Sequence, residues 1–193
     1  MSLTVYNKKR NFNQTTEPAG TGRKQSKSLA FVVQRHKAKQ LHYDFRLELD
    51  GVLKSWAVPK GPSLNPKDKR LAVMVEDHPY DYKDFQGMIP YGNYGAGIVE
   101  IWDKGTYSDI QHSPKTISEK IIHDGLLAGN LKFILSGEKL KGEFALVQLK
   151  GKSKKNWLLI KHHDQYAVDD AYSSEDYTEK NSPINIWLRE NKD

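Results

Sequence analysis

Residues 41–49 carry the pattern that most constrains this chain, because apolar and polar side chains alternate there without a break. Successive side chains of a β-strand point to opposite faces, so this period of two predicts a strand with two chemically distinct faces. The apolar face is formed by Leu41, Tyr43, Phe45, Leu47 and Leu49. The polar face is formed by His42, Asp44, Arg46 and Glu48. We expect the first face to build a core and the second to carry chemistry.

Short apolar segments of the same kind recur along the chain and are separated by turn signals such as Asp50-Gly51 and Asn65-Pro66. They predict strands at residues 29–34, 52–58, 70–76, 97–103, 131–135, 143–149 and 157–162. Helical spacing at 115–127, ended by Gly125 or Gly129, and an apolar stretch at 184–190 predict one or two helices. The fold class we expect is mainly β, a compact single-domain β-barrel with one or two peripheral helices.

The barrel domain is expected to cover residues 29–170. A flexible polar N-terminal arm at 1–28 would precede it, and an acidic segment with a short C-terminal helix at 171–193 would follow. Thirty Lys and Arg against 24 Asp and Glu give a net charge of +6, which favours a polyanionic partner through phosphate contacts. No cysteine is present, which excludes disulfides, a Cys nucleophile and Cys-ligated zinc. We expect no membrane span and no secretory signal.

The polar face of residues 41–49 brings an imidazole and a carboxylate to one side of a strand, ~7 Å apart along it. His36, six residues before His42 across a short polar stretch, could swing in as a third ligand. Imidazole suits zinc, copper, iron and nickel, whereas oxygen ligands and phosphate favour manganese or magnesium. Arg46 follows on the same face and could grip a phosphate. The alternative is a half-exposed amphipathic strand with a His–Asp pair and an Arg–Glu pair.

A second group of candidate residues follows the strand at 70–76, where Pro79 and acidic residues would end it. His78 could donate to a phosphate oxygen or protonate a leaving group, with Tyr82 beside it; both could instead cap local backbone. Lys60 in a turn and Arg70 at a strand start are phosphate-binding candidates or solvated surface cations.

The loop at 87–97 is rich in Gly and Tyr but lacks the Walker A pattern. Tyr91 or Tyr94 could stack on a base or sugar, or could simply pack in the core and turn.

Four ordered segments together resemble the 3′-phosphoesterase domain of bacterial DNA ligase D, over about residues 4–170. They read FVVQRHKAKQLHYDFRLELDGVLKSWAVPKGPS, VEDHPYDYKDFQGMIPYGNYGAGIVEIWDKGTY, LKGEFALVQLK and WLLIKHHD. The resemblance implies a compact β-barrel in which His36, His42 and Asp44 bind Mn²⁺, with other divalent transition metals such as Co²⁺ as substitutes. Ligase and polymerase motifs are absent from the printed sequence, so we expect a stand-alone version of this module.

The resemblance also implies roles for the remaining candidates. Arg46, His78 and Tyr82 would engage the scissile phosphate, and Gln34 and Glu76 would be needed for catalysis. The substrate-binding residues would be Arg10, Glu17, Lys60 and Arg70. Asn11 stands where the family pattern has Asp, a departure that bears on removal of ribonucleotides.

The function implied is manganese-dependent healing of DNA 3′ ends. The enzyme would remove a 3′-phosphate, and 3′-terminal ribonucleotides, from primer-template ends for double-strand break repair by end joining. We expect a cytoplasmic, nucleoid-associated monomer that acts with a separate DNA ligase, a polymerase and Ku. Two alternatives remain open. A non-catalytic nucleic-acid-binding β-barrel would bind DNA without metal-dependent turnover, and a two-His-one-carboxylate iron oxygenase would bind iron and consume oxygen.

Overall fold

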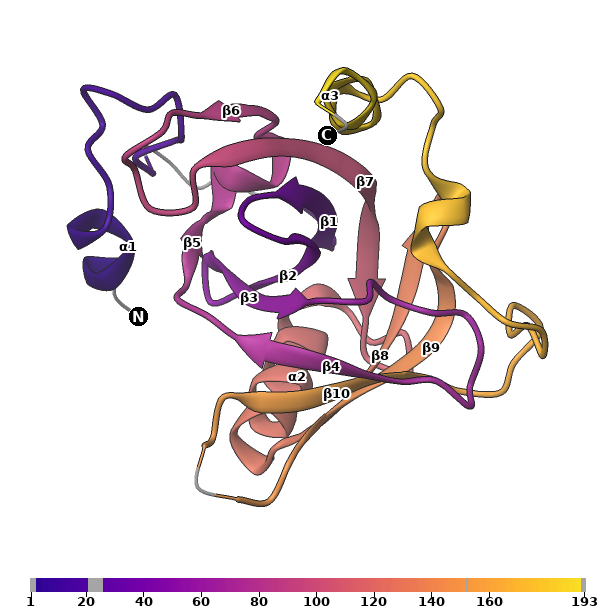
Figure 1. Ribbon diagram of the computed structural model, residues 1–193. Coiled ribbons are helices and arrows are strands. Elements are labelled where there is room, and N and C mark those ends of the chain that lie inside the picture. Colours follow the sequence, from indigo (N-terminus) through magenta and orange to yellow (C-terminus); the bar gives the residue numbers. More distant parts are fainter. Residues whose placement is uncertain (1–2, 21–25, 152, 192–193) are drawn as a thin grey trace.

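Eight antiparallel strands close into a barrel in the computed structural model, which describes residues 3–20, 26–151 and 153–191 (Figure 1). Their order around the barrel is β1-β2-β3-β4-β10-β9-β8-β7, and pairing of β1 with β7 closes it. The strands are β1 (Leu29–Lys37), β2 (Leu41–Leu49), β3 (Val52–Val58), β4 (Lys69–Met74), β7 (Gly97–Ser108), β8 (Asn130–Gly137), β9 (Lys141–Gln148) and β10 (Asn156–Lys161). The predicted mainly β barrel is confirmed.

Two short strands lie outside the closed ring. The strand β5 (His78–Pro79) pairs with β3, and β6 (Gly87–Ile89) pairs with β7. The predicted strand at 70–76 ends at Met74, so His78 belongs to β5 and not to the end of β4. A 3₁₀ helix, η1 (Tyr80–Asp84), follows β5. This β5–η1 segment lies against the outer face of the barrel.

The prediction of one or two helices was too low, since the described residues contain three α-helices. These are α1 (Thr4–Lys8), α2 (Lys115–Ala128) and α3 (Pro183–Glu190), and a second 3₁₀ helix is η2 (Ser174–Tyr177). The five residues of α1 are too few for helical periodicity to appear in the sequence. Gly129, at φ 72°, ends α2 in the left-handed region where glycine is favoured, as predicted.

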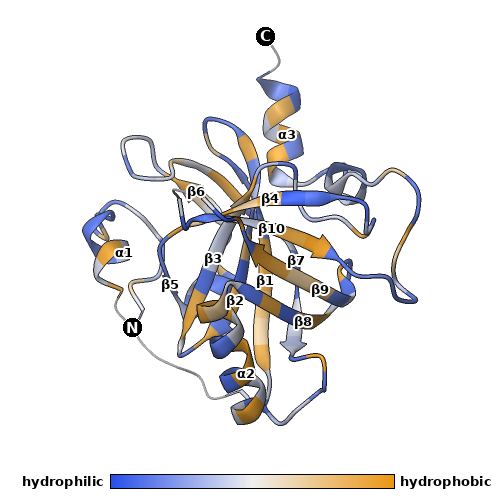
Figure 2. Ribbon diagram, turned by 90° about the horizontal axis from the view of Figure 1, so that it is seen from below, coloured by the Kyte–Doolittle hydropathy of each residue, from blue (hydrophilic) through white to orange (hydrophobic). Residues whose placement is uncertain are grey.

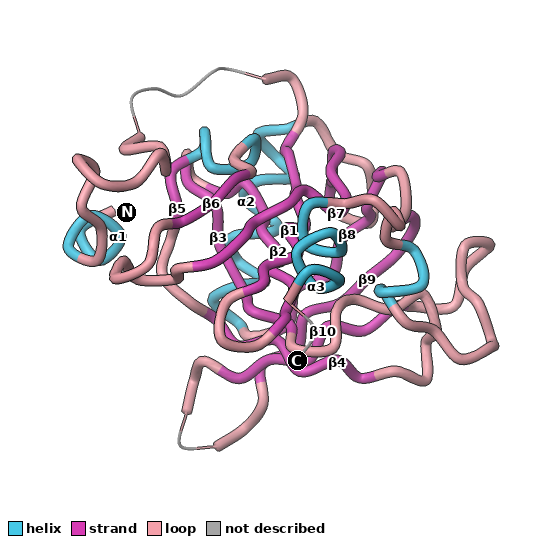
Figure 3. The backbone as a smooth tube through the Cα atoms, turned by 45° about the horizontal axis from the view of Figure 1, so that its top comes forward, coloured by secondary structure: helices cyan, strands magenta, loops and turns pink. Residues whose placement is uncertain are grey.

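The helices occupy different parts of the barrel surface. Figure 2 shows α2 and α3 at opposite ends of the strands, and Figures 1 and 3 place α1 on the flank beside β5. Because Tyr6 of α1 is fully buried, this part of the predicted arm packs against the barrel. No helix among the described residues has both the length and the apolar character needed to cross a membrane.

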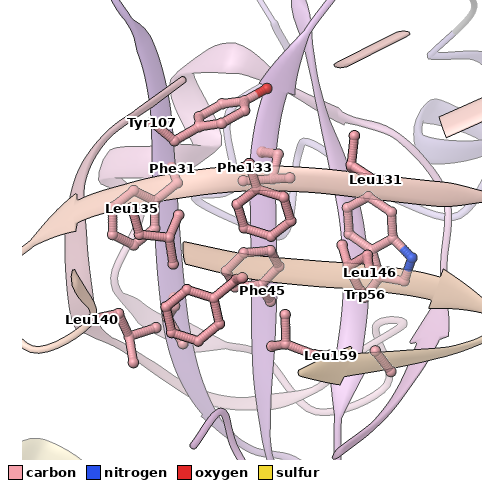
Figure 4. Close-up of a cluster of buried hydrophobic side chains, with 14 of the residues drawn as sticks. Phe31, Phe45, Trp56, Tyr107, Leu131, Phe133, Leu135, Leu140, Leu146 and Leu159 are labelled. Atoms are coloured by element: carbon pink, nitrogen blue, oxygen red, sulfur yellow. The ribbon is translucent and has the colours of Figure 1, made fainter. Parts of the chain in front are cut away.

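Large side chains fill the barrel interior (Figure 4). Phe45 stacks on Phe133 with ring centroids 5.9 Å apart, and Phe133 lies parallel to Phe144 at 6.3 Å. Trp56 meets Trp157 edge to face at 6.1 Å. A core packed in this way leaves no room for a substrate inside the barrel. Any ligand site of the barrel strands must therefore lie on the outside or at an end.

The outer face of β1, β2 and β3 is covered as well. A second apolar cluster is made of Tyr6, Leu53, Tyr80, Tyr82, Phe85, Ile89 and Val99. It joins the N-terminal segment and the β5–η1 segment to the barrel wall. Asp44 and Arg46 of β2 are buried beneath this cover, 7% and 2% exposed, and His42 is half-buried. The alternative of a half-exposed amphipathic strand is therefore wrong.

Candidate functional site

A cavity of about 210 Å³ opens on the outer face of β1, β2 and β3. Eight of the predicted site residues line it, namely Arg10, His36, His42, Asp44, Arg46, Glu76, His78 and Tyr82. They come from the N-terminal segment, two barrel strands, the loop between β4 and β5, and the β5–η1 segment. The fourth polar residue of β2, Glu48, lies elsewhere and binds Lys115 of α2 at 2.8 Å.

The two imidazoles meet because of the register of β1 and β2, in which His36 pairs directly with His42 and Gln34 with Asp44. His36 Nδ1 lies 3.5 Å from Asp44 Oδ2, and His42 Nε2 lies 3.6 Å from Asp44 Oδ1. The donor atoms of His36, His42 and Asp44 are all within 4.8 Å of one another. His36 is the third member of this group, as predicted, but it needs no swing, because β1 continues to Lys37 and strand pairing holds it in place.

Backbone carbonyls select the tautomer of both imidazoles. His36 Nε2 lies 2.9 Å from the carbonyl of Gly95, and His42 Nδ1 lies 3.0 Å from that of Gln40. A carbonyl only accepts, so each of these nitrogens carries the proton. The opposite nitrogens, Nδ1 of His36 and Nε2 of His42, face Asp44 and are the ones that a metal would bind through their lone pairs. Two imidazole nitrogens and a carboxylate converge, and a backbone carbonyl holds the far side of each ring, as is common in protein metal sites.

The spacing of these atoms suits a cation. Metal–nitrogen and metal–oxygen bonds of about 2.1 Å, at angles between tetrahedral and trigonal, separate two ligand atoms by about 3.5 Å. The two His–Asp distances, each to a different oxygen of Asp44, are close to this value. Three acceptors without a proton between them repel one another unless a cation is shared. His36, His42 and Asp44 thus fit the predicted metal-ligand set by geometry and by chemistry.

Arg46 orients the carboxylate from the next position on β2. Its three nitrogens donate to Asp44 Oδ2 at 3.0 Å, to Gln34 Oε1 at 2.7 Å and to Ser55 Oγ at 2.9 Å. Burial by itself would raise the pKa of Asp44, but the positive charge of Arg46 is the largest of the opposing influences, and that pKa lies well below its ordinary value. Asp44 is therefore a charged carboxylate at neutral pH.

Gln34 is fully buried and links Arg46 to the covering segment. Its amide nitrogen donates to the carbonyls of Tyr82, at 3.0 Å, and Phe85, at 2.8 Å, while its oxygen accepts from Arg46. The register of β1 with β7 shifts between Val33 and Gln34, a β-bulge of the kind that often lies beside a site. The contacts of Gln34 are those of a positioning residue.

His78 is held as a neutral imidazole. Its Nδ1 lies 2.9 Å from the carbonyl of Glu76 and must donate, so Nε2 accepts from Arg10 Nη2 at 3.2 Å. Burial lowers the pKa of His78 well below its ordinary value, and the charges of Arg46 and Arg10 lower it further. In this state Nε2 cannot donate a proton. A phosphate dianion in the cavity would offset both guanidinium charges and favour the protonated form.

Arg10 and Glu17 enter the site from the N-terminal segment. Arg10 Nε donates to Glu17 at 2.9 Å, and its Nη1 lies 3.2 Å from Glu76 Oε1. Tyr82 donates its hydroxyl proton to the same Glu17 oxygen at 2.9 Å, and Thr15 donates to the other at 3.0 Å. Burial raises the pKa of Tyr82 well above its ordinary value, so the phenol stays protonated. Glu17 thus holds Arg10 and Tyr82 in place.

Three other sequence candidates lie apart from the residues that line this cavity. Lys60 is exposed beyond β3. Arg70 donates to Asp68 at 2.8 Å and to the carbonyl of Tyr172 at 2.7 Å. Asn11 is exposed and accepts from the backbone of Asn13. The phosphate-binding roles of Lys60 and Arg70 stay predictions.

The loop between β6 and β7 supplies one contact that the sequence did not reveal and carries the two tyrosines that it did. Gly95 offers its carbonyl to His36 from φ 77°, a conformation that favours glycine. Tyr94 lines the cavity, is 51% exposed, and has Lys9 Nζ 4.1 Å from its ring centre. Tyr91 is fully exposed, so packing in a core is wrong for both tyrosines.

Comparison with known proteins places the chain in a family. The chain matches the sequence model of the DNA ligase D 3′-phosphoesterase domain over residues 34–148. It is 52% identical over 166 residues, 84% of its length, to the multifunctional non-homologous end joining protein LigD of Pseudomonas aeruginosa. It is 43% identical over 164 residues, also 84% of its length, to the protein of the same name from Mycolicibacterium smegmatis. A third relative, the multifunctional non-homologous end joining DNA repair protein LigD of Mycobacterium tuberculosis, is 43% identical over 150 residues, 77% of the chain. The matched part is 19%, 21% and 18% of these relatives, so the chain spans about a fifth of their length.

Proposed function

This chain belongs to the DNA ligase D 3′-phosphoesterase domain family, and from that premise we propose that it is a metal-dependent hydrolase that heals 3′ ends of DNA. Its substrates are a 3′-phosphate and, in a preceding step, a 3′-terminal ribonucleotide at a primer-template end. The product is a 3′-hydroxyl. A ligase or polymerase needs such an end, which fits the end-joining role in the names of the relatives.

The observation that carries the proposal is the convergence of His36, His42 and Asp44 beside two buried guanidinium groups. Arg46 and Arg10 line the same 210 Å³ cavity as the three acceptor atoms. An anion that can also ligate a metal satisfies both halves of the cavity at once. A phosphate ester is such an anion.

The residues that would hold the metal are His36, His42 and Asp44. A divalent cation, Mn²⁺ or in its place Co²⁺, would supply Lewis-acid polarisation of a phosphoryl oxygen and a water of lowered pKa. Imidazole and carboxylate ligands together suit manganese and the later transition metals. The choice of Mn²⁺ follows from the family resemblance.

Arg46 is the residue we assign to transition-state stabilisation. Its Nη1 and Nη2 each make one of the bonds to Ser55 and Asp44, which leaves one N–H on each for phosphate oxygens. Charge-assisted bonds that are already oriented stabilise charge that develops on those oxygens. His78, once protonated beside the bound dianion, delivers its Nε2 proton to the leaving oxygen. Before Nε2 can take up that proton, Arg10 must leave it and pair with the phosphate instead.

Hydrolysis of a 3′-phosphate primer-template with and without MnCl₂ tests the proposal. We expect phosphate release only with metal, and a loss of roughly 100-fold or more for His42→Ala, since removing one group that stabilises the transition state has cost 10² or more elsewhere. Calorimetry with Mn²⁺ should show binding to the wild type and not to the variant. His163→Ala is the matched control, because that imidazole is exposed and is not among the residues lining the cavity.

Full activity of His42→Ala would contradict the enzyme assignment. DNA binding without turnover would then leave the non-catalytic barrel. The two-His-one-carboxylate grouping also occurs in non-haem iron oxygenases. The guanidinium groups of Arg46 and Arg10 in the cavity favour an anionic substrate over that alternative.

The cellular setting is proposed from the resemblance alone. The enzyme acts as a monomer in the cytoplasm, at the nucleoid. It passes healed ends to a ligase and a polymerase, with Ku holding the break. Co-purification of the tagged protein with Ku and a ligase from cells with broken DNA tests this setting.

A further inference from the structure

The catalytic cavity continues into a longer surface groove. A depression of about 920 Å³ shares Ala38, His42 and Gly95 with the cavity. A second depression, of about 220 Å³, shares Ala38, Tyr91 and Ala96 with the 920 Å³ depression. The three spaces therefore form one path, with His42 at its start. We name the two depressions together the aromatic groove.

The aromatic groove presents exposed ring and methionine surface. Tyr91 is 101% exposed and Met88 is 55% exposed, although both side chains are large and apolar in part. At the far end Trp187 of α3 lines the groove, with Lys37 Nζ 5.2 Å from its ring centre. A tyrosine that stands clear of the protein in this way has its ring face free for another flat group.

The charge of the groove has one sign. Lys37 and Lys39 line it, and no carboxylate lines either depression among the described residues. A depression of about 720 Å³ on another part of the barrel is different, since Glu143 and Asp164 line it. Cationic walls with exposed aromatic rings are the combination by which proteins hold unpaired nucleotides.

We propose that the aromatic groove binds, as single-stranded DNA, the nucleotides that precede the scissile 3′ group. Tyr91 stacks on a base, and Lys37 and Lys39 contact backbone phosphates. This inference rests on the proposed function, because the DNA strand enters the groove from the 3′-phosphate bound in the cavity, and His42 lies where the cavity and the groove meet. Bases must be unpaired to stack on Tyr91, so a duplex end frays by the nucleotides that occupy the groove.

Fluorescence anisotropy with a labelled single-stranded oligonucleotide that ends in a 3′-phosphate tests the inference directly. In EDTA the measurement reports binding without turnover. We expect Tyr91→Ala to raise the Kd roughly tenfold, from the usual contribution of a base–aromatic stack, and Tyr91→Phe to keep the wild-type Kd. The effect of Tyr91→Ala should shrink as the oligonucleotide is shortened to a nucleoside 3′-phosphate.

Tyr166→Ala is the matched control. Tyr166 is 42% exposed and lines the depression that contains Glu143 and Asp164. The Kd of the Tyr166→Ala variant for the oligonucleotide should equal that of the wild type. The double variant Lys37→Gln/Lys39→Gln should lower the slope of log K against log salt by about 1.4, about 0.7 for each phosphate contact on a single strand.

The outcomes separate this inference from the proposed function. The inference is overturned if the wild type does not bind the oligonucleotide, if Tyr91→Ala binds as tightly as the wild type, or if Tyr166→Ala weakens binding as much. Hydrolysis of the 3′-phosphate by the wild type would still support the proposed function in each case. Conversely, if Tyr91→Ala binds the oligonucleotide tenfold more weakly but the wild type hydrolyses no 3′-phosphate, the DNA-binding groove is supported and the proposed enzyme activity is refuted.

Discussion

Replacement of Arg46 by Met should destabilise the metal-free protein by about 3–5 kcal/mol, the usual cost of removing one partner from a buried ion pair. The side chains of Arg46 and Asp44 are 3% and 10% exposed, and their nitrogen and oxygen lie 3.0 Å apart. Met fills a similar volume, so the lost charge and not a cavity dominates. The buried carboxylate of Asp44 would be left without its nearest cation.

The pH dependence should change along with the stability. In the wild type the pKa of Asp44 lies below its ordinary value of 3.8, so its contribution is present above that pH and is lost as pH falls further. Without Arg46, burial is the largest remaining influence, and we expect it to raise that pKa above its ordinary value. The variant then gains stability as pH falls through the raised pKa. The difference in free energy of unfolding between the wild type and Arg46→Met should therefore become smaller from pH 7 to pH 4.

Urea denaturation in EDTA, followed by tryptophan fluorescence, measures both effects. Asp44→Asn and the double variant complete a thermodynamic cycle. Because the double variant leaves no unpaired charge, its cost should be smaller than the sum of the two single costs. The reasoning is refuted if the single costs add, or if the gap between wild type and Arg46→Met stays constant over that pH range.

Three further predictions concern the frame of the site. In the wild type the pKa of His78 is low in the folded state, so below about pH 6.5 the unfolded chain takes up the proton first. The free energy of unfolding then falls by up to about 1.4 kcal/mol per pH unit, and His78→Gln should remove this decline. Denaturation midpoints at pH 7.5 and 5.5 measure the difference. Gly97→Ala should lower the melting temperature more than Gly95→Ala does. A Cβ at position 97 would lie 2.0 Å from the Lys37 carbonyl oxygen, whereas one at position 95 would make only ordinary contacts and carry the strain of φ 77°. Equal melting temperatures would contradict this. Phe133→Ala should cost about 3–5 kcal/mol in urea denaturation with Mn²⁺ affinity retained, since the ring lies inside the barrel and the metal ligands outside it.

Local patterns in the sequence were enough for part of this protein. The alternation in residues 41–49 placed Phe45 in the core and Asp44 and Arg46 together on the opposite face, as the structure confirms. Helical spacing predicted α2 nearly to its ends. The ordered motifs identified the family, which the comparisons confirm. All of these depend on residues close in the chain, whose relative positions the period of a strand or helix determines.

The closure of the barrel and the segments that cover its outer face could be seen only in the tertiary structure. Cross-strand register set His36 opposite His42 without any swing, and a turn with positive φ brought the Gly95 carbonyl to it. Nothing local indicated that a segment near residue 10 would cover the outer face of β2 and bring Arg10 to His78, 68 residues away. Such contacts depend on which of many apolar surfaces pack together across long loops, so the free energy that selects them belongs to the whole fold.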